Sequence, residues 1–202
     1  MERFKEDFPD KLKNFNLEQL ESSKQSIYAL SNDLKFIYFN PEWFQFAEEN
    51  GLDKEALQKF KLGTSIGKAI YGIVIRSFYK RKYRKIIATS DIWHHDLECS
   101  SSKEFRYYHQ GVYPLKEKAG ILVINSLMFK LPMNNMNRET FTAIEERYMH
   151  SDGHITQCVN CRHTQRADKP EHWDWVPTWA KKIPVNSKLI LCPNCIDFYR
   201  KS

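Results

Sequence analysis

Four of the five cysteines form two matched pairs, and their spacing is the strongest chemical signal in the chain. The pairs are Cys158-Val-Asn-Cys161 and Cys192-Pro-Asn-Cys195, and 30 residues separate them. Two residues between paired thiols let both sulfurs face one ion at about 2.3 Å, and two such pairs complete the tetrahedron that Zn²⁺ prefers. Four thiolates leave no position for water or substrate, so the pattern predicts a structural zinc site and not a catalytic one.

Two other chemistries could use the same four thiols. A redox dithiol or disulfide pair is one alternative, and an iron–sulfur cluster is the other. Zinc is favoured because paired cysteines in an intracellular chain serve metals more often than disulfides. His163 is a competing metal ligand, since it follows Cys161 by two residues. Cys99 is a single thiol near an expected turn, and we expect it to pack as a small apolar residue.

The formal net charge of +6 has its source in one short stretch. Six basic residues and no acidic residue occur between 76 and 85, so the rest of the chain sums to zero. The apolar residues around them recur at helical spacing, which predicts an amphipathic helix over about 73–88. A solvated helix face is the simplest explanation, and a docking patch for an acidic partner or nucleic acid is the alternative. The basic residues are Arg76, Lys80, Arg81, Lys82, Arg84 and Lys85.

The pattern of strands and turns predicts an antiparallel sheet. Two β-rich runs flank the turn residues 31–33, which is typical of a hairpin. Asn40-Pro41 then predicts a helix start, with the asparagine as N-cap and the proline in the first turn. This order of elements indicates an α+β fold, with helices on one face of an antiparallel five-stranded sheet. The later strands are expected at about 92–99, 104–116 and 120–130.

Two segments resemble PAS sensor domains. Residues 26–44 read SIYALSNDLKFIYFNPEWF, which is similar to the opening hairpin and helix start of that family. Residues 104–127 read EFRYYHQGVYPLKEKAGILVINSL, which is similar to its last two strands. The resemblance covers about residues 17–130 and implies a PAS-like domain that senses a ligand, redox state or partner. An unidentified small molecule is then a candidate occupant of the PAS pocket. Asn125-Ser126 departs from the Asp-Ile-Thr that ends many PAS domains.

The tail also resembles a known segment. Its elements are CVNCRHTQ, HWDWVPTW and LCPNC. They are similar to the paired-cysteine and tryptophan segment that follows PAS or response-regulator domains in many bacterial signalling proteins. The resemblance implies a signalling role in which a conformational change passes through the helix after the PAS domain.

We therefore expect four parts in the chain. Phe141, Ile144 and Tyr148 lie at helical spacing, which predicts a helix that joins the two folded parts. Its apolar stripe could pack on the sheet or form the seam of a homodimer, and two heptads are too few for a sustained coiled coil. The parts are an N-terminal extension at 1–16, the PAS-like domain at 17–132, the linker helix at 133–152 and the four-cysteine zinc-binding module at 153–202.

Signal transduction through a partner protein is the expected function. No nucleotide-binding loop, hydrolase elbow, metalloprotease or kinase motif is found, so we expect no enzymatic activity. The alternative is a transcriptional regulator that binds nucleic acid through the basic helix and zinc module, but the metallated tail is near neutral and does not favour it. A cytoplasmic location is expected, because the apolar runs are far shorter than the roughly 20 residues that cross a bilayer.

Haem sensing is a third hypothesis, and the positions of the histidines do not favour it. Some PAS domains hold haem through an axial histidine on a helix, whereas His94, His95 and His109 fall on expected strands. Alternation along a strand turns only one of the adjacent pair His94 and His95 inward. We expect each of the three to be a packed or solvent-facing side chain.

Overall fold

The structure is a computed structural model that describes residues 2–201 apart from 50–51, 53–56, 58–59 and 102. The chain divides into two compact units. The first unit comprises Met1–Leu97 and Tyr108–Leu127, and the second comprises Glu98–Tyr107 and Met128–Ser202. Among the described residues, no helix combines the length and the apolar character that crossing a membrane would require.

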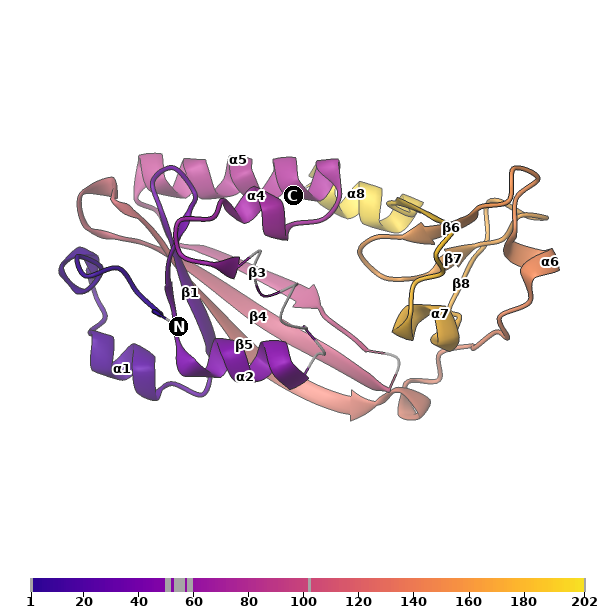
Figure 1. Ribbon diagram of the computed structural model, residues 1–202, viewed down its shortest axis with the longest axis horizontal. Coiled ribbons are helices and arrows are strands. Elements are labelled where there is room, and N and C mark those ends of the chain that lie inside the picture. The colour runs from indigo at the N-terminus through magenta and orange to yellow at the C-terminus, as the bar shows by residue number, and fades with distance from the viewer. Residues whose placement is uncertain (1, 50–51, 53–56, 58–59, 102, 202) are drawn as a thin grey trace. The chain divides into compact units, whose positions relative to one another are not determined.

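Five strands form one sheet: β1 Ser26–Ser31, β2 Phe36–Phe39, β3 Trp93–Glu98, β4 Glu104–Pro114 and β5 Gly120–Pro132. Their order is β2-β1-β5-β4-β3, so the last strand lies in the centre of the sheet (Figure 1). Strand β1 pairs antiparallel with both β2 and β5, and Tyr28 lies opposite Phe39 on one side and Val123 on the other. The predicted hairpin and three later strands are confirmed.

Among the described residues, three helices pack on one face of this sheet: α2 Pro41–Glu49, α4 Ile66–Ala69 and α5 Ile73–Thr89. Helix α2 begins where expected, because the Asn40 side-chain oxygen accepts a hydrogen bond from the Trp43 backbone N–H at 3.0 Å. Helix α5 is amphipathic, as its spacing predicts, and its buried residues are Ile75, Phe78, Tyr83, Ile86 and Ile87. The α+β fold class with a five-stranded antiparallel sheet is therefore confirmed.

Aromatic side chains fill the described part of the core between the helices and the sheet. The rings of Phe39 and Trp43 have centroids 4.5 Å apart. Tyr28 of β1 and Tyr83 of α5 meet with their hydroxyl oxygens 3.0 Å apart. Burial raises the pKa of Tyr28 to about 12, so this hydroxyl keeps its proton, and its hydrogen bond to Tyr83, well into the alkaline range. A small-molecule ligand in this domain stays a prediction.

The N-terminal stretch covers the other face of the sheet. It contains a 3-10 turn, η1 Pro9–Lys11, and a short helix, α1 Leu17–Ser22. Phe8 is fully buried and stacks on Tyr38 of β2, with ring centroids 4.5 Å apart. The Lys5 backbone N–H donates to the Ile37 carbonyl oxygen at 3.0 Å. Residues 1–16, expected as an extension, are thus part of the folded first unit.

The second unit contains a small sheet of four strands in the order β8-β7-β6-β9. Strands β6 and β9 pair in parallel, whereas β7 pairs antiparallel with both β6 and β8. Tyr148, Ile155 and Val176 form its hydrophobic cluster. The elements are β6 Ile155–Cys158, β7 Thr164–Gln165, β8 Trp173–Asp174, α7 Pro177–Lys181, β9 Ser187–Ile190 and α8 Pro193–Lys201.

The linker does not form the helix predicted over 133–152. This stretch holds a 3-10 turn at Met133–Met136 and one helical turn, α6 Glu145–Tyr148. The Phe141 backbone N–H donates to the Trp175 carbonyl oxygen at 3.0 Å, a long-range bond that a helix would replace. Packing inside this unit therefore outweighs local helical spacing. The described residues of this stretch therefore do not form the helix on which we expected the homodimer seam.

Candidate metal centre and adjoining pocket

The first cysteine pair lies in a tight turn at the end of β6. Cys158 is the last residue of that strand, and its backbone N–H donates to the His163 carbonyl oxygen at 2.7 Å. Within the turn, the Arg162 N–H donates to the Cys158 carbonyl oxygen at 3.0 Å, and Arg162 has a positive φ of 64°. These bonds fold the chain back so that Cys158 and Cys161 face the same space.

The second pair lies between β9 and α8. In the parallel register Cys158 lies opposite Ile190, the last residue of β9, so both chain segments leave the sheet at the same end. Helix α8 begins at Pro193, with Cys192 before it and Cys195 in its first turn. Proline suits the first turn because the N–H that it lacks would have no partner inside the helix.

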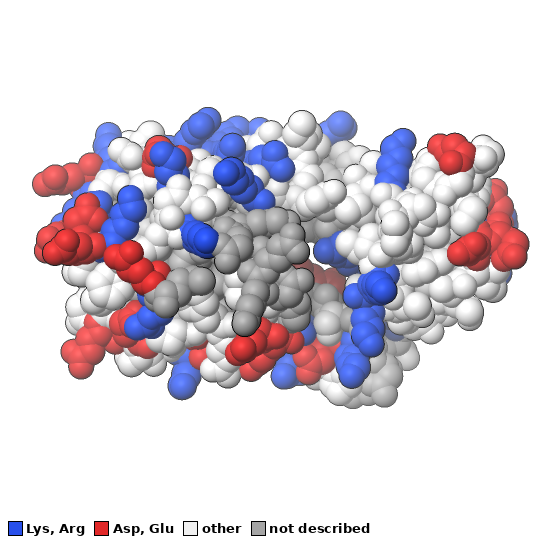
Figure 2. Space-filling view, viewed as in Figure 1, with Lys and Arg blue, Asp and Glu red and all other residues white. Residues whose placement is uncertain are grey.

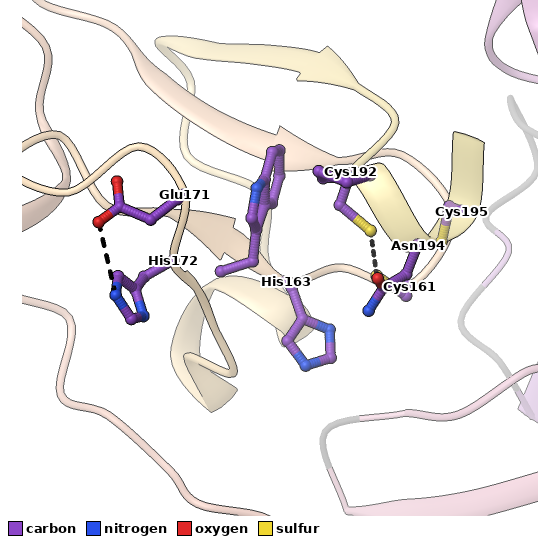
Figure 3. Close-up of a pocket in the computed structure, with 9 residues that line it drawn as sticks. Cys161, His163, Glu171, His172, Cys192, Asn194 and Cys195 are labelled. Carbon is purple, nitrogen blue, oxygen red and sulfur yellow. Dashed lines mark hydrogen bonds and ion pairs between the residues drawn. The ribbon is translucent and has the colours of Figure 1, made fainter. Parts of the chain in front are cut away.

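The four sulfurs converge. Their ligand atoms all lie within 4.8 Å of one another. The Sγ atoms of Cys161 and Cys192, which Figure 3 joins by a dashed line, are 3.7 Å apart. Four sulfurs at 2.3 Å from one tetrahedral ion would be about 3.8 Å apart, so the spacing suits zinc. Cys158, Cys192 and Cys195 are buried, and Cys161 is partly exposed. The structure thus brings together all four cysteines that the sequence singles out.

Hydrogen bonds from neighbouring groups support these sulfurs. The Asn160 side-chain amide donates to the Cys195 sulfur at 3.4 Å, and the Tyr199 hydroxyl donates to the Asn160 side-chain oxygen at 2.8 Å. The Cys192 backbone N–H donates to the Cys158 sulfur at 3.4 Å. Such outer contacts orient thiolates and stabilise their negative charge. The sequence did not reveal these roles of Asn160 and Tyr199, because their partners lie 35 and 39 residues away and meet them only in the folded chain.

The thiols do not titrate alike in the absence of an ion. A hydrogen bond from Cys161 lowers the pKa of Cys158 far below its usual range, and the same interaction raises the pKa of Cys161. Adjacent thiolates repel one another, so a cluster of four needs a cation before every sulfur can ionise. Metal binding at this centre would therefore release protons.

His163 is not one of the converging ligands, because the cluster contains the four cysteines alone among the described residues. Its ring lies 5.4 Å from the Trp175 ring, measured between centroids. Burial lowers the pKa of His163, and the nearby Arg138 charge lowers it further. The side chain lines a pocket of about 390 Å³ that also contains Cys161 and Cys192 (Figure 3). His163 is therefore a wall of the pocket beside the metal centre.

The six basic residues of helix α5 fall into two groups of three. The Arg76 guanidinium donates to the Ile70 carbonyl oxygen at 3.2 and 3.3 Å, and the Lys82 ammonium lies 5.7 Å from the centroid of the Trp93 ring. Lys80 packs over Gly67. The other three, Arg81, Arg84 and Lys85, are exposed and share one helix face. Figure 2 shows Lys and Arg gathered along the edge that α5 forms in Figure 1.

The strand histidines follow the expected alternation. His95 is half-buried and stacks on Trp93, whereas His94 is exposed. On the exposed side, His94 Nδ1 lies 2.9 Å from His109 Nε2, and His109 Nδ1 lies 2.6 Å from the Asp96 carboxylate. The sequence did not identify this hydrogen-bonded chain of three side chains, because they come from two strands whose register the sequence does not specify.

No protein-family model and no curated protein matches the chain. Solved structures resemble part of it. The phage VqmA–DPO complex covers 55% of this chain and 50% of its own, at 13% identity and a TM-score of 0.41. The PAS domain of Bordetella pertussis BvgS covers 55% of this chain and 82% of its own, at 15% identity and a TM-score of 0.38. The Vibrio cholerae VqmA dimer, a LuxR-type receptor, covers 56% and 50%, at 11% identity and a TM-score of 0.36. This chain thus spans about half the length of each VqmA chain.

Proposed function

We propose that the protein is a cytoplasmic signal-transduction protein without catalytic activity, in which a PAS-like sensory or interaction domain is joined to a structural zinc module. The observation that carries this proposal is the closed set of four thiols at the spacing of a tetrahedral zinc site. An ion with four protein ligands stabilises a fold and keeps no position for water or substrate. The signal would then pass to a partner protein.

Cys158, Cys161, Cys192 and Cys195 would hold the ion. Zinc would tie the turn after β6 to the start of α8, and the hydrogen bond from Asn160 would orient the Cys195 sulfur. The exposed face of α5 is the proposed docking surface for an acidic partner, because its basic side chains there are not used in packing.

Native mass spectrometry of the purified chain tests the metal site. We expect one zinc ion per chain, together with the mass of any small molecule that the first unit retains. Cys158→Ser and Cys192→Ser should each lose the ion, whereas the control Cys99→Ser should keep it, since Cys99 lies outside the cluster. A metal-free chain lighter by the mass of four protons would indicate two disulfides, and redox sensing would replace the proposal.

A regulator that binds nucleic acid is the second candidate, and the exposed cations of α5 favour it. Fluorescence anisotropy with duplex DNA across a salt series separates it from the first. If DNA binds, replacing Arg81, Arg84 and Lys85 by Gln should flatten the salt dependence by about 0.9 in log–log slope per charge in contact with phosphate. The matched control replaces Lys13, Lys116 and Lys118, which are exposed elsewhere in the first unit. Wild-type chain that does not bind DNA at low salt eliminates this candidate.

Homodimerisation belongs to the proposal as a prediction of the sequence. Light scattering coupled to size-exclusion chromatography measures it directly. A mass of one chain across the accessible concentration range would remove the dimer from the proposal and leave the metal site and the partner surface unaffected.

A further inference from the structure

The second unit has a cavity of about 520 Å³ beside the metal centre. It shares His163, His172 and Trp173 with the pocket that contains the cysteines. The rest of its wall consists of Arg138, Glu139, Phe141, Arg166, Asp174 and Trp175. This volume falls in the range of sites that bind small molecules in proteins.

Four side chains on this wall carry a buried polar atom that has no hydrogen-bond partner among the described residues. The atoms are Arg138 Nη1, His163 Nδ1, Trp173 Nε1 and Trp175 Nε1. Leaving such a group buried without a partner is unfavourable, so several of them on one wall point to a missing partner. Three are obligate donors, and the imidazole nitrogen of His163 can donate as well.

The guanidinium is held in place by its other contacts. Arg138 Nη2 donates to the Glu98 carboxylate at 3.2 Å, and the guanidinium lies 4.8 Å from the centroid of the Trp175 ring. These two contacts leave Nη1 as the unpaired end of the fork. A guanidinium held by two contacts, on the same wall as two unpaired indole N–H groups, can receive an acceptor with little further cost of ordering its side chain.

Of the remaining charged residues on this wall, Asp174 and Arg166 are already engaged, and Glu139 is exposed to solvent. The Asp174 carboxylate accepts a hydrogen bond from the Tyr148 hydroxyl at 2.8 Å, and the Arg166 guanidinium pairs with Asp168 at 2.6 Å. The unpaired groups are therefore donors, and the ligand must supply acceptors. A carboxylate offers about four lone-pair sites on two oxygens.

We infer that this cavity binds a small organic carboxylate, whose oxygens accept hydrogen bonds from Arg138 and from the indoles of Trp173 and Trp175. The aromatic wall suits a planar body attached to the carboxylate. A phosphate dianion fits less well, because a zinc ion with four thiolates carries net negative charge next to the cavity. The inference goes beyond the proposed function. A chain that holds zinc and binds no carboxylate would refute the inference and leave the proposed function unaffected.

Sodium benzoate is the probe, and the five tryptophan indole N–H signals of the zinc-loaded chain are the readout. In nitrogen–proton correlation spectra, benzoate should shift the Trp173 and Trp175 signals in a saturable way. The signals of Trp43, Trp93 and Trp179 should stay in place. Benzamide, which has the same ring and no charge, should bind at least about tenfold more weakly, because hydrogen bonds to a charged acceptor are the stronger ones.

Conservative variants separate donor loss from misfolding. Trp173→Phe and Trp175→Phe keep an aromatic ring and remove the N–H, so each should weaken benzoate binding about tenfold. The matched control is Trp179→Phe, whose ring packs on Tyr148 instead of the cavity and which should bind benzoate normally. Arg138→Lys should also weaken binding, while zinc content shows that each variant keeps its metal centre.

Three results would overturn the inference. One is the absence of any benzoate-induced indole shift up to roughly ten millimolar probe, a concentration that detects even weak binding. A second is equal binding of benzoate and benzamide, or tighter binding of inorganic phosphate. The third is cross-relaxation of the Trp173 and Trp175 N–H protons with long-lived water that benzoate does not displace, which would mean that ordered water satisfies these donors.

Discussion

The buried pair Tyr148 and Asp174 joins two segments of the second unit that are 26 residues apart in sequence. The Tyr148 side chain is fully buried, and its hydroxyl is the donor that satisfies the carboxylate. Asp174 is 7% exposed. A buried carboxylate that loses its donor bears the full cost of desolvation, so this one hydroxyl decides whether the carboxylate is tolerated.

Tyr148→Phe should therefore destabilise the second unit by about 1–3 kcal/mol. The ring that packs on Trp179 stays, so the loss reports the hydroxyl alone. Urea unfolding of the zinc-loaded chain measures the change. Tyr71→Phe serves as the control, because Tyr71 is 66% exposed and its substitution should change stability by less than about 0.5 kcal/mol. An equal effect of both substitutions would contradict the role of the hydroxyl.

The same hydroxyl makes stability depend on alkaline pH. Burial, and then the hydrogen bond to Asp174, raises the pKa of Tyr148 from 10.0 to about 12 in the folded protein. Between these two values the unfolded chain loses the proton first, so this contribution to stability is full below pH 10 and disappears as the pH rises to about 12. Tyr148→Phe should reduce the alkaline loss of stability, which Tyr28 of the first unit also contributes to.

The N-terminal stretch of the first unit contributes through its buried side chains, although little of it is regular helix or strand. Phe8 itself lies in a turn, yet it is fully buried in a cluster with Leu12, Leu20 and Ile37. The backbone bond from Lys5 to β2 extends the edge of the sheet. Removing this stretch would expose the apolar face that Ile37 and its neighbours form.

Phe8→Ala should cost about 3–5 kcal/mol of the stability of the first unit, because it deletes a fully buried aromatic ring. Chemical unfolding followed through the first-unit tryptophans, in a chain whose second-unit tryptophans are replaced, measures this loss. The control Ile73→Ala removes a side chain that is 78% exposed and should change stability by less than about 0.5 kcal/mol. A small effect of Phe8→Ala would mean that the stretch is an appendage.

Elements with local signals could be predicted from the sequence, and elements held by distant contacts could not. The hairpin, the N-cap at Asn40 and helix α5 all follow from patterns within a few residues. The four-cysteine site could be predicted from the spacing within and between the two cysteine pairs. By contrast, the non-helical backbone at Phe141 bonds to Trp175, and the cavity beside the metal centre combines Arg138 with residues more than twenty positions away. The periodic pattern of apolar residues does not specify contacts between residues so far apart in the sequence.

At the scale of the whole molecule, each of the hydrophobic clusters described above lies within one unit. The clusters around Phe39 and Phe8 belong to the first unit, and the cluster around Tyr148 belongs to the second. The second unit is small, so its stability should depend on the metal that closes it. The first unit has a larger aromatic core and needs no metal ligand.

Removal of zinc by a chelator should therefore unfold the second unit and leave the first intact. Hydrogen exchange followed by mass spectrometry should show lost protection in β6 and β9 and retained protection in β1 and α5. Cys192→Ser should reproduce this pattern without chelator, and Cys99→Ser should not. Loss of protection in α5 as well would mean that the two units fold as one.

Because β6 and β9 pair in parallel, a long connection joins them, and we expect this connection to tolerate an insertion. Val185, between α7 and β9, is fully exposed, whereas the next residue, Asn186, holds β9 beside β6 because its carbonyl oxygen accepts a hydrogen bond from the Ile155 backbone N–H at 3.2 Å. Lengthening a loop costs little entropy, so a Gly-Ser insertion after Val185 should leave the zinc content unchanged, whereas the same insertion after Leu191 should abolish it. A peptide tag or fluorophore grafted at Val185 could thus report on the module from within the chain.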